Sequence, residues 1–160
     1  MGSKTSVVFL GVDMFEQYWV IVLPLVITGL TQIVKAFVVM GQTGHFKFES
    51  LFKWGGFPSS HMALVSSVAT VAGLVDGIRS VTFVIALSFA ILVMRDAMGL
   101  RMFVEHHSRA INVLREQSSA KVQARIPKQR LSIGHTRVEI AGGIIFGVGL
   151  TLLAFYAIGF

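Results

Sequence analysis

The sequence predicts an all-α integral-membrane protein: a helical bundle of about four spanning helices, with an amphipathic helix and a loop on the cytoplasmic side. Hydrophobic residues make up 54% of the 160 residues and charged residues only 14%, whereas charged residues make up about 25% of soluble domains. The mean hydropathy is +0.73. The length predicts a single domain, residues 1–160.

Four apolar segments are the expected spans, because a spanning helix needs about 20 apolar residues. They lie near residues 18–40, 59–75, 81–99 and 139–160. Lys35 interrupts the first near its end, and the second ends at Asp76-Gly77. At the end of the third, Gly99 fits a helix C-cap. The fourth is rich in glycine, which lets helices approach closely. The second and third are short, and the alternative for them is a buried helix that does not cross completely.

Two polar connections, residues 41–57 and 101–134, lie on the same side of a four-span protein. They carry most of the lysines and arginines, and the net charge is +6. The positive-inside rule therefore predicts a cell (inner) membrane protein with this side in the cytoplasm. The second connection begins as an amphipathic helix, and its polar run around Pro127 predicts a mobile loop. The basic residues lack interleaved aromatics, which favours membrane lipids over nucleic acid as partners.

The segment Gly55-Gly56-Phe57-Pro58-Ser59-Ser60-His61, before the second span, is the first candidate site. Paired glycines allow a tight turn that brings backbone N–H groups close to a ligand. Ser59 or Ser60 can cap the following helix, whose free amides favour an anion. His61 can then give or take a proton near neutral pH. The alternative is an ordinary capped helix start with a polar histidine at the membrane interface.

His135 and Glu139 form the second candidate site, at the start of the last span. Residues four apart share a helix face. A carboxylate bonded to one imidazole nitrogen raises the basicity of the other, which prepares a histidine as a nucleophile. The alternative is a salt link in which Glu139 complements the helix dipole.

Three more polar residues lie at the ends of apolar segments. Asp96 and Arg101 close the third span, where a buried acidic–basic pair is a functional candidate. Lys35 lies near the end of the first, where the alternative is a snorkelling lysine. In a four-span topology these residues, His61 and His135 all face one side. Independent structural explanations do not predict that shared position.

No metal and no cofactor are expected. The neighbours His106 and His107 point to different helix faces, whereas a helical metal site needs ligands three or four residues apart. A solvated amphipathic face explains them better. The sequence has no cysteine, which excludes thiolate chemistry.

Together these motifs resemble the divergent branch of the type-2 phosphatidic acid phosphatase superfamily, which also includes the vanadium haloperoxidases. The resemblance extends from about Thr31 to Glu139 and into the last helix. The matching segments are Gln32 to Lys35, Gly55 to Ala63, Asp96 to Arg101 and Gly134 to Ile140. The combination is specific, although each segment alone is not.

The resemblance implies a metal-independent phosphatase that forms a phosphohistidine. By position, His135 is the nucleophile, Glu139 orients it, and His61 is the general acid that protonates the leaving oxygen. The residues implied in phosphate binding are Lys35, Gly56, Ser59, Ser60, Asp96, Arg101 and Arg130.

The sequence departs from the superfamily pattern at several positions. The acidic residue after the histidine is Glu139, where the superfamily has aspartate at the same spacing. The arginine six residues before the histidine is replaced by Gln129. Arg130, Arg101 or Arg137 could substitute for it. Four spans instead of the usual six leave the pocket incomplete, which suggests a homodimer.

The expected activity is hydrolysis of a lipid phosphate, either phosphatidate, phosphatidylglycerophosphate or a polyprenyl phosphate or pyrophosphate. The alternative is a non-catalytic membrane protein that binds or translocates phospholipids or polyprenyl phosphates. The segment from Asp96 to Arg101 also suggests a CDP-alcohol phosphotransferase. That chemistry needs further aspartates downstream, and the sequence has none after Asp96.

Overall fold

The computed structural model describes residues 14–45, 55–129, 131 and 135–158, and in these ranges every regular element is an α-helix. Side chains are described for all of these residues except 14–17, 100–102 and 158. The helices are α1 (Met14–Thr43), α2 (Ser60–Val75), α3 (Val81–Glu116), α4 (Ala120–Arg125) and α5 (Arg137–Ile158). The predicted all-helical membrane bundle is confirmed.

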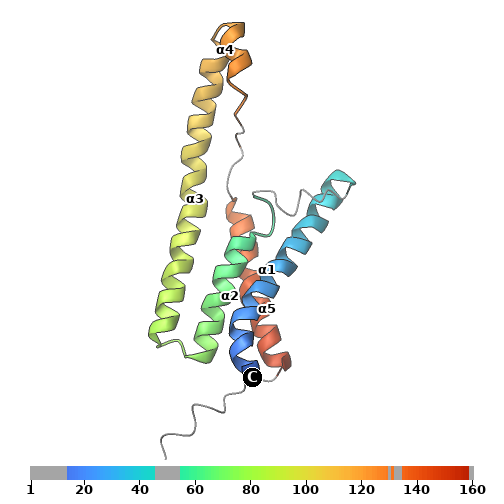
Figure 1. The fold of residues 1–160 in the computed structure, drawn as a ribbon, viewed down its shortest axis with the longest axis vertical. Helices are drawn as coiled ribbons and strands as arrows, with labels where there is room; N and C mark the ends of the chain where they lie inside the picture. Colours follow the sequence, from blue (N-terminus) through green and yellow to red (C-terminus); the bar gives the residue numbers. More distant parts are fainter. Residues whose placement is uncertain (1–13, 46–54, 130, 132–134, 159–160) are drawn as a thin grey trace, which may run out of the picture.

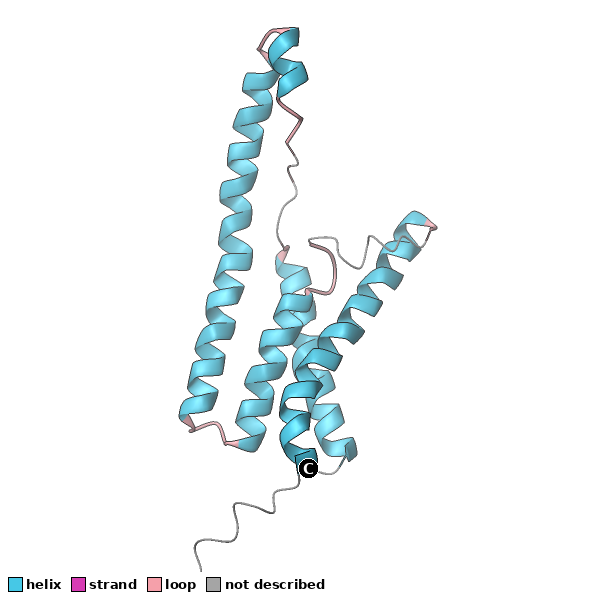
Figure 2. Ribbon diagram, viewed as in Figure 1, coloured by secondary structure: helices cyan, strands magenta, loops and turns pink. Residues whose placement is uncertain are grey.

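Helices α1, α2 and α5 form a bundle, and α3 lies along α2 (Figure 1). In this view α1 and α3 run upward while α2 and α5 run downward. Helix α2 is central, since it packs against α1, α3 and α5. The C-terminal part of α3 extends past the end of the bundle, and the short α4 lies at its tip (Figure 2).

Three described helices are long and apolar enough to cross a membrane, over Tyr18–Thr43, Val81–Glu116 and Arg137–Ala157. Helix α2 is apolar but has 16 residues, and at about 1.5 Å per residue it falls short of a hydrocarbon core of about 30 Å. The predicted four spans therefore become three helices of spanning length and one shorter helix. Because three other helices pack around α2, protein replaces lipid along much of its surface.

The sequence predicts a helix C-cap at Gly99, and the structure contradicts this prediction. Helix α3 continues without a break to Glu116, so the first half of the predicted polar connection is helical. Gly99 lacks the left-handed backbone of a C-cap glycine, whereas Gly77 has φ +87 and follows the end of α2 as predicted. A glycine inside a helix costs only about 1 kcal/mol relative to alanine. The helical residues on both sides of Gly99 offset that cost.

The polar segment after α3 contains the short helix α4, so residues 120–125 are not the predicted loop. Side-chain hydrogen bonds to the backbone tie this segment to α3, and its mobility stays a prediction. Asn112 bonds to both backbone groups of Gln129, at 2.8 Å to the N–H and 3.0 Å to the C=O. Arg115 donates to the carbonyls of Ile126 and Gln123, at 2.7 and 3.2 Å. We call residues 103–129 the projecting hairpin.

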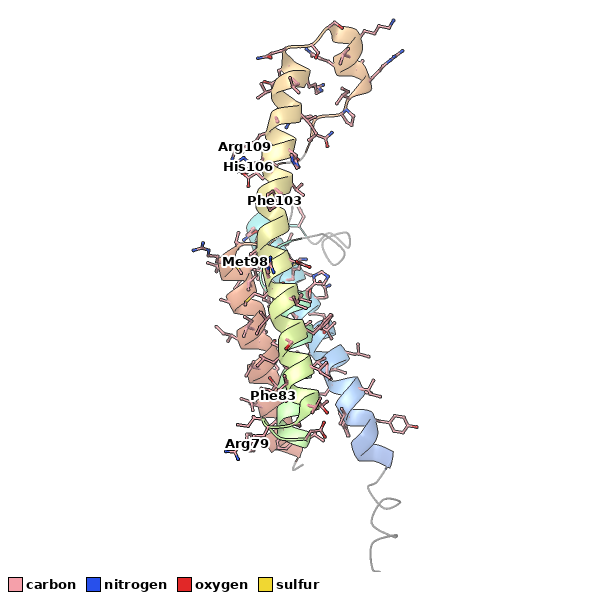
Figure 3. All side chains as sticks on the ribbon, turned by 90° about the vertical axis from the view of Figure 1, so that its left-hand side faces the viewer. Arg79, Phe83, Met98, Phe103, His106 and Arg109 are labelled. Atoms are coloured by element: carbon pink, nitrogen blue, oxygen red, sulfur yellow. The ribbon has the colours of Figure 1, made fainter. Side chains whose placement is uncertain are left out.

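The outer surface of the helices is apolar. Large exposed side chains include Ile21, Leu25, Phe37, Ile85, Phe89, Leu92, Ile145 and Leu153. Figure 3 looks onto the outer side of α3, from Phe83 near its start through Met98 and Phe103 to Arg109. An apolar surface of this extent fits helices that face lipid.

Small residues line the contact between α2 and α5. A Cβ at Gly147 would lie 2.5 Å from the Ala63 carbonyl oxygen, so only glycine fits there. Ser67 and Thr151 form a buried hydrogen bond of 2.7 Å across the same contact. The glycine-rich last span thus packs closely, as predicted. This contact sets the position of the start of α2 relative to the start of α5.

Candidate active site

Predicted site residues from three helices converge at one end of the bundle. Helix α1 reaches this end with its C-terminal half, while α2 and α5 begin there (Figure 1). The rings of His61 and His135 lie 6.0 Å apart between centroids, at an angle of 65°. The Lys35 side chain passes 3.0 Å from where a Cβ on Gly56 would stand. The structure therefore brings together one lysine and two histidines that are far apart in the sequence.

His135 lies just before α5 and is 8% exposed. Its Nδ1 is 3.2 Å from Oε2 of Glu139. The backbone N–H of Thr136 donates to the same carboxylate oxygen at 2.9 Å. A carboxylate at Nδ1 favours the tautomer with its proton on that nitrogen, which leaves the Nε2 lone pair for attack.

Burial is the largest effect on the pKa of His135 and lowers it below the ordinary value of 6.5. The hydrogen bond and charge of Glu139 raise this pKa, while the charges of His61 and Lys35 lower it. Because burial dominates, His135 remains neutral to a lower pH than a solvated histidine would. The neutral imidazole is the form that can act as a nucleophile.

Two glycines with positive φ shape the segment before α2: Gly55 at +81 and Gly56 at +100. Ser59 is the N-cap, and its side chain accepts a bond of 3.5 Å from the Met62 N–H. The Ser59 N–H donates to the Glu139 carbonyl at 3.0 Å, so this amide is not available to a phosphate. The Ser60 N–H makes no backbone hydrogen bond within the described ranges. It can therefore donate to an anion.

Lys35 is 3% exposed, so it is not a snorkelling lysine. Its side chain lies over Gly56. A side chain at position 56 would crowd Lys35, which is a reason for glycine there. One helical turn earlier, the side-chain oxygen of Gln32 is buried without a hydrogen-bond partner. Buried polar atoms are normally bonded, so this acceptor can take a hydrogen bond from a bound molecule.

The structure does not bring Asp96 into this group. Asp96 is exposed on α3, and no ion pair joins it to another described side chain. The backbone of Arg101 belongs to α3 but its side chain lies outside the description, and Arg130 lies outside the described residues. Their phosphate-binding roles stay predictions.

Gln129 occupies the position where the superfamily pattern has its arginine, and Asn112 holds it on the projecting hairpin. Ala97 packs against the cluster that contains Ile140, near the start of α5. At 1.5 Å per residue, Asn112 lies about 22 Å further along α3 than Ala97. The superfamily's arginine position is therefore held well away from His135.

His106 and His107 are exposed on the projecting hairpin, away from the two clustered histidines. Within the described part of the chain, no three His, Cys, Asp or Glu side chains gather to hold a metal ion. The expectation of a metal-free and cofactor-free site stays a prediction.

Sequence reasoning missed Thr136 and the partner of Phe57. The Thr136 hydroxyl accepts a bond of 3.2 Å from the Glu139 N–H. The Thr-x-x-Glu spacing of a capping box was visible in the sequence. The Phe57 ring lies against Gly142, where a side chain would clash with it. No sequence signal predicts that contact, because it depends on how α5 packs.

Comparison with known proteins identifies the family of this chain. It matches the Divergent PAP2 family over residues 17–150, which is most of its length. The chain belongs to the Divergent PAP2 family. A curated relative in Bacillus subtilis (strain 168), the "Uncharacterized membrane protein YuiD", is 30% identical over 113 residues, covering 64% of this chain and 72% of the relative. No solved structure shows a significant match. Membership in the Divergent PAP2 family confirms the resemblance seen in the motifs, and the apolar helices agree with a PAP2-like membrane protein.

Proposed function

We propose that this protein is an integral-membrane phosphatase that hydrolyses a lipid phosphate through a phosphohistidine intermediate. The main support is the pairing of His61 with His135, 6.0 Å apart, with Glu139 at Nδ1 of His135. The apolar outer walls of the helices suit a substrate with a lipid chain, such as phosphatidate, phosphatidylglycerophosphate or a polyprenyl phosphate or pyrophosphate.

In the proposed reaction, Nε2 of His135 attacks phosphorus, and an N–P bond forms as the P–O bond to the leaving group breaks. The protonated His61 gives its proton to the leaving oxygen. A water molecule then attacks the phosphohistidine, and His61 takes a proton from that water. The N–P bond breaks, inorganic phosphate leaves, and His135 is again neutral.

Lys35 and the Ser60 N–H supply the positive charge and the hydrogen bond that a phosphoryl group in transit needs. The Lys35 side chain is buried, and its charge acts on His135. Electrostatic stabilisation is stronger at a buried position, because water screens it less. Ser59 contributes at most its hydroxyl proton, since its N–H is bonded to Glu139.

The test is phosphate release by the purified protein in lipid nanodiscs, measured against a panel of lipid phosphates. We expect His135→Ala and His61→Ala to lower kcat by about 10²- to 10⁴-fold, the usual contribution of a positioned acid or base. His106→Ala is the matched control, because His106 is exposed on the projecting hairpin. A labelled phosphoryl group should be trapped in an acid-labile form on the parent and not on His135→Ala. Full activity in both site variants would falsify the assignment.

A second candidate is a non-catalytic protein that binds or translocates a lipid phosphate. It is favoured by the position of Gln129, which the bonds to Asn112 hold on the projecting hairpin in place of a phosphate-binding arginine. Tight lipid phosphate binding without phosphate release, over a range of pH, would favour this candidate. Phosphate release that depends on His135 would refute it.

We further infer that the site lies on the cytoplasmic side of the cell (inner) membrane, by the positive-inside rule. Because the sequence has no cysteine, single introduced cysteines report topology cleanly. Ser119→Cys lies on the projecting hairpin, and Ile78→Cys lies at the opposite end of the bundle. An impermeant maleimide should label Ile78→Cys from outside the membrane and Ser119→Cys only after lysis. The reverse pattern would show that the site faces outward.

A further inference from the structure

We propose that Thr136 is a positioning residue for His135, and that it acts by holding the Glu139 carboxylate in a capping box. The proposal rests on the proposed function, in which His135 is the nucleophile. Neither the motif pattern nor the family match assigns a role to Thr136.

The first step is the geometry of the box itself. The Thr136 hydroxyl accepts from the Glu139 N–H at 3.2 Å, and the Glu139 carboxylate accepts from the Thr136 N–H at 2.9 Å. The Thr136 carbonyl accepts the first helical bond, from Ile140 N–H at 3.0 Å. These reciprocal bonds make Thr136 the N-cap of α5 and Glu139 its third residue.

The second step is that one oxygen serves two purposes. Oε2 of Glu139 accepts from the Thr136 N–H and also lies 3.2 Å from Nδ1 of His135. The box therefore places the carboxylate that contacts the imidazole. His135 itself precedes the helix, so the bonds inside α5 do not fix its ring directly. Its orientation depends on the carboxylate and on the side chains packed around it.

The third step links the box to the other histidine. The Glu139 carbonyl accepts from the Ser59 N–H at 3.0 Å, and Ser59 is the N-cap of the helix that carries His61. Glu139 therefore contacts both halves of the site, through its carboxylate and its carbonyl. A disordered first turn of α5 would disturb both histidines.

The capping box also explains the glutamate. The superfamily pattern has aspartate four residues after the histidine, and this chain has Glu139. A side chain at the third helical position must reach back to the N-cap amide, and capping boxes use the long side chains of glutamate or glutamine there. Aspartate is one methylene shorter, so we expect Glu139→Asp to weaken the bond to Thr136, the bond to His135, or both.

The charged groups around His135 determine what a variant should do. Glu139 on α5 raises the pKa of His135, while Lys35 on α1 and His61 on α2 lower it, as does burial. If the Glu139 carboxylate loses its position, it raises the pKa of His135 less. The lowering effects of burial, His61 and Lys35 remain. The pKa of His135 should then fall further, and the acidic limb of the kcat/KM profile should move to lower pH.

The test uses the full chain in nanodiscs with Thr136→Val, which keeps the shape and removes the acceptor, and Thr136→Ser, which keeps the acceptor. We expect Thr136→Val to lower kcat about tenfold at nearly constant KM, consistent with a misplaced catalytic group. It should also move the His135 titration, followed by NMR of labelled imidazoles, to lower pH. Thr136→Ser should keep the kcat and the His135 titration of the parent. Glu139→Asp should behave like Thr136→Val.

Unchanged kcat and an unchanged His135 titration in Thr136→Val would overturn the proposal while leaving the proposed function intact. If the parent protein releases no phosphate, the proposed function fails, and the titration still tests the positioning role. If Thr136→Val does not fold, Thr136→Gly replaces it, because glycine is tolerated at an N-cap and has no side-chain acceptor. A normal titration in a folded Thr136→Gly would equally overturn the proposal.

Discussion

The bundle and the projecting hairpin are each stabilised by a different kind of internal contact. In the bundle, α2 meets α5 through glycines and a buried Ser67–Thr151 bond, and a cluster around Met62 and Val65 adds apolar packing. In the projecting hairpin, side chains such as Asn112 and Arg115 bind backbone groups near an exposed surface. Close packing leaves few alternative arrangements, whereas each polar bond competes with water.

The two regions also treat their histidines differently. His61 and His135 lie together where packed helices begin, and His135 is buried. His106 and His107 are exposed on the hairpin. Only the first environment can shift a pKa by burial and hold a ring against a carboxylate. The comparison indicates that changes in the bundle should affect both stability and activity, while changes in the hairpin should stay local.

The largest effect is expected from Gly147→Ala, which breaks the bundle contact. The new Cβ would meet the Ala63 carbonyl oxygen at 2.5 Å, so α2 and α5 must separate. Overpacking of this kind costs about 1–3 kcal/mol. We expect a lower Tm in nanodiscs and lower phosphate release, since the separation also moves His61 away from His135.

The matched control is Gly149→Ala on the same helix. A Cβ at Gly149 has nothing within 4 Å, so its Tm should equal or slightly exceed that of the parent. An equal loss of stability in both variants would show that glycine matters here for the helix itself and not for the contact with α2.

A smaller and local effect is expected from Asn112→Ala in the projecting hairpin. This change removes both bonds to Gln129, and hydrogen bonds of this kind contribute about 0.5–1.5 kcal/mol each. Hydrogen exchange should rise around residues 117–129 and stay unchanged in α2 and α5. Phosphate release that falls as far as in Gly147→Ala would contradict the separation of the two regions.

The smallest effect is expected from the ion pair between Arg109 and Glu105 on the hairpin part of α3. The side chains are 2.6 Å apart, but that of Arg109 is 65% exposed. Exposed pairs one helical turn apart contribute about 0.3–0.5 kcal/mol, less at high salt. Arg109→Gln should therefore leave the Tm within about 1 °C at 0.5 M salt. A larger drop would mean that the hairpin is coupled to the bundle.

The helical segments and several of their ends could be predicted from the sequence, because they depend on local chemistry. Gly77 follows the end of α2 as predicted, with the left-handed backbone of a C-cap. Gly99 looked the same in sequence, and α3 continues through it. A glycine permits a helix end without requiring one, so the surrounding helix decides. The bonds from Asn112 and Arg115 likewise could not be predicted, because their partners lie 8 to 17 residues away.

The sequence by itself determined the parts that depend on spacing along one helix. The apolar segments, a serine cap at Ser59 or Ser60 and the four-residue spacing of His135 and Glu139 all belong to this class. Only the tertiary structure decided that His61 lies 6.0 Å from His135 and that Lys35 is buried over Gly56. Those distances depend on how closely α1, α2 and α5 pack. Helix packing is set by the shapes of facing side chains, which residues on a single helix do not specify.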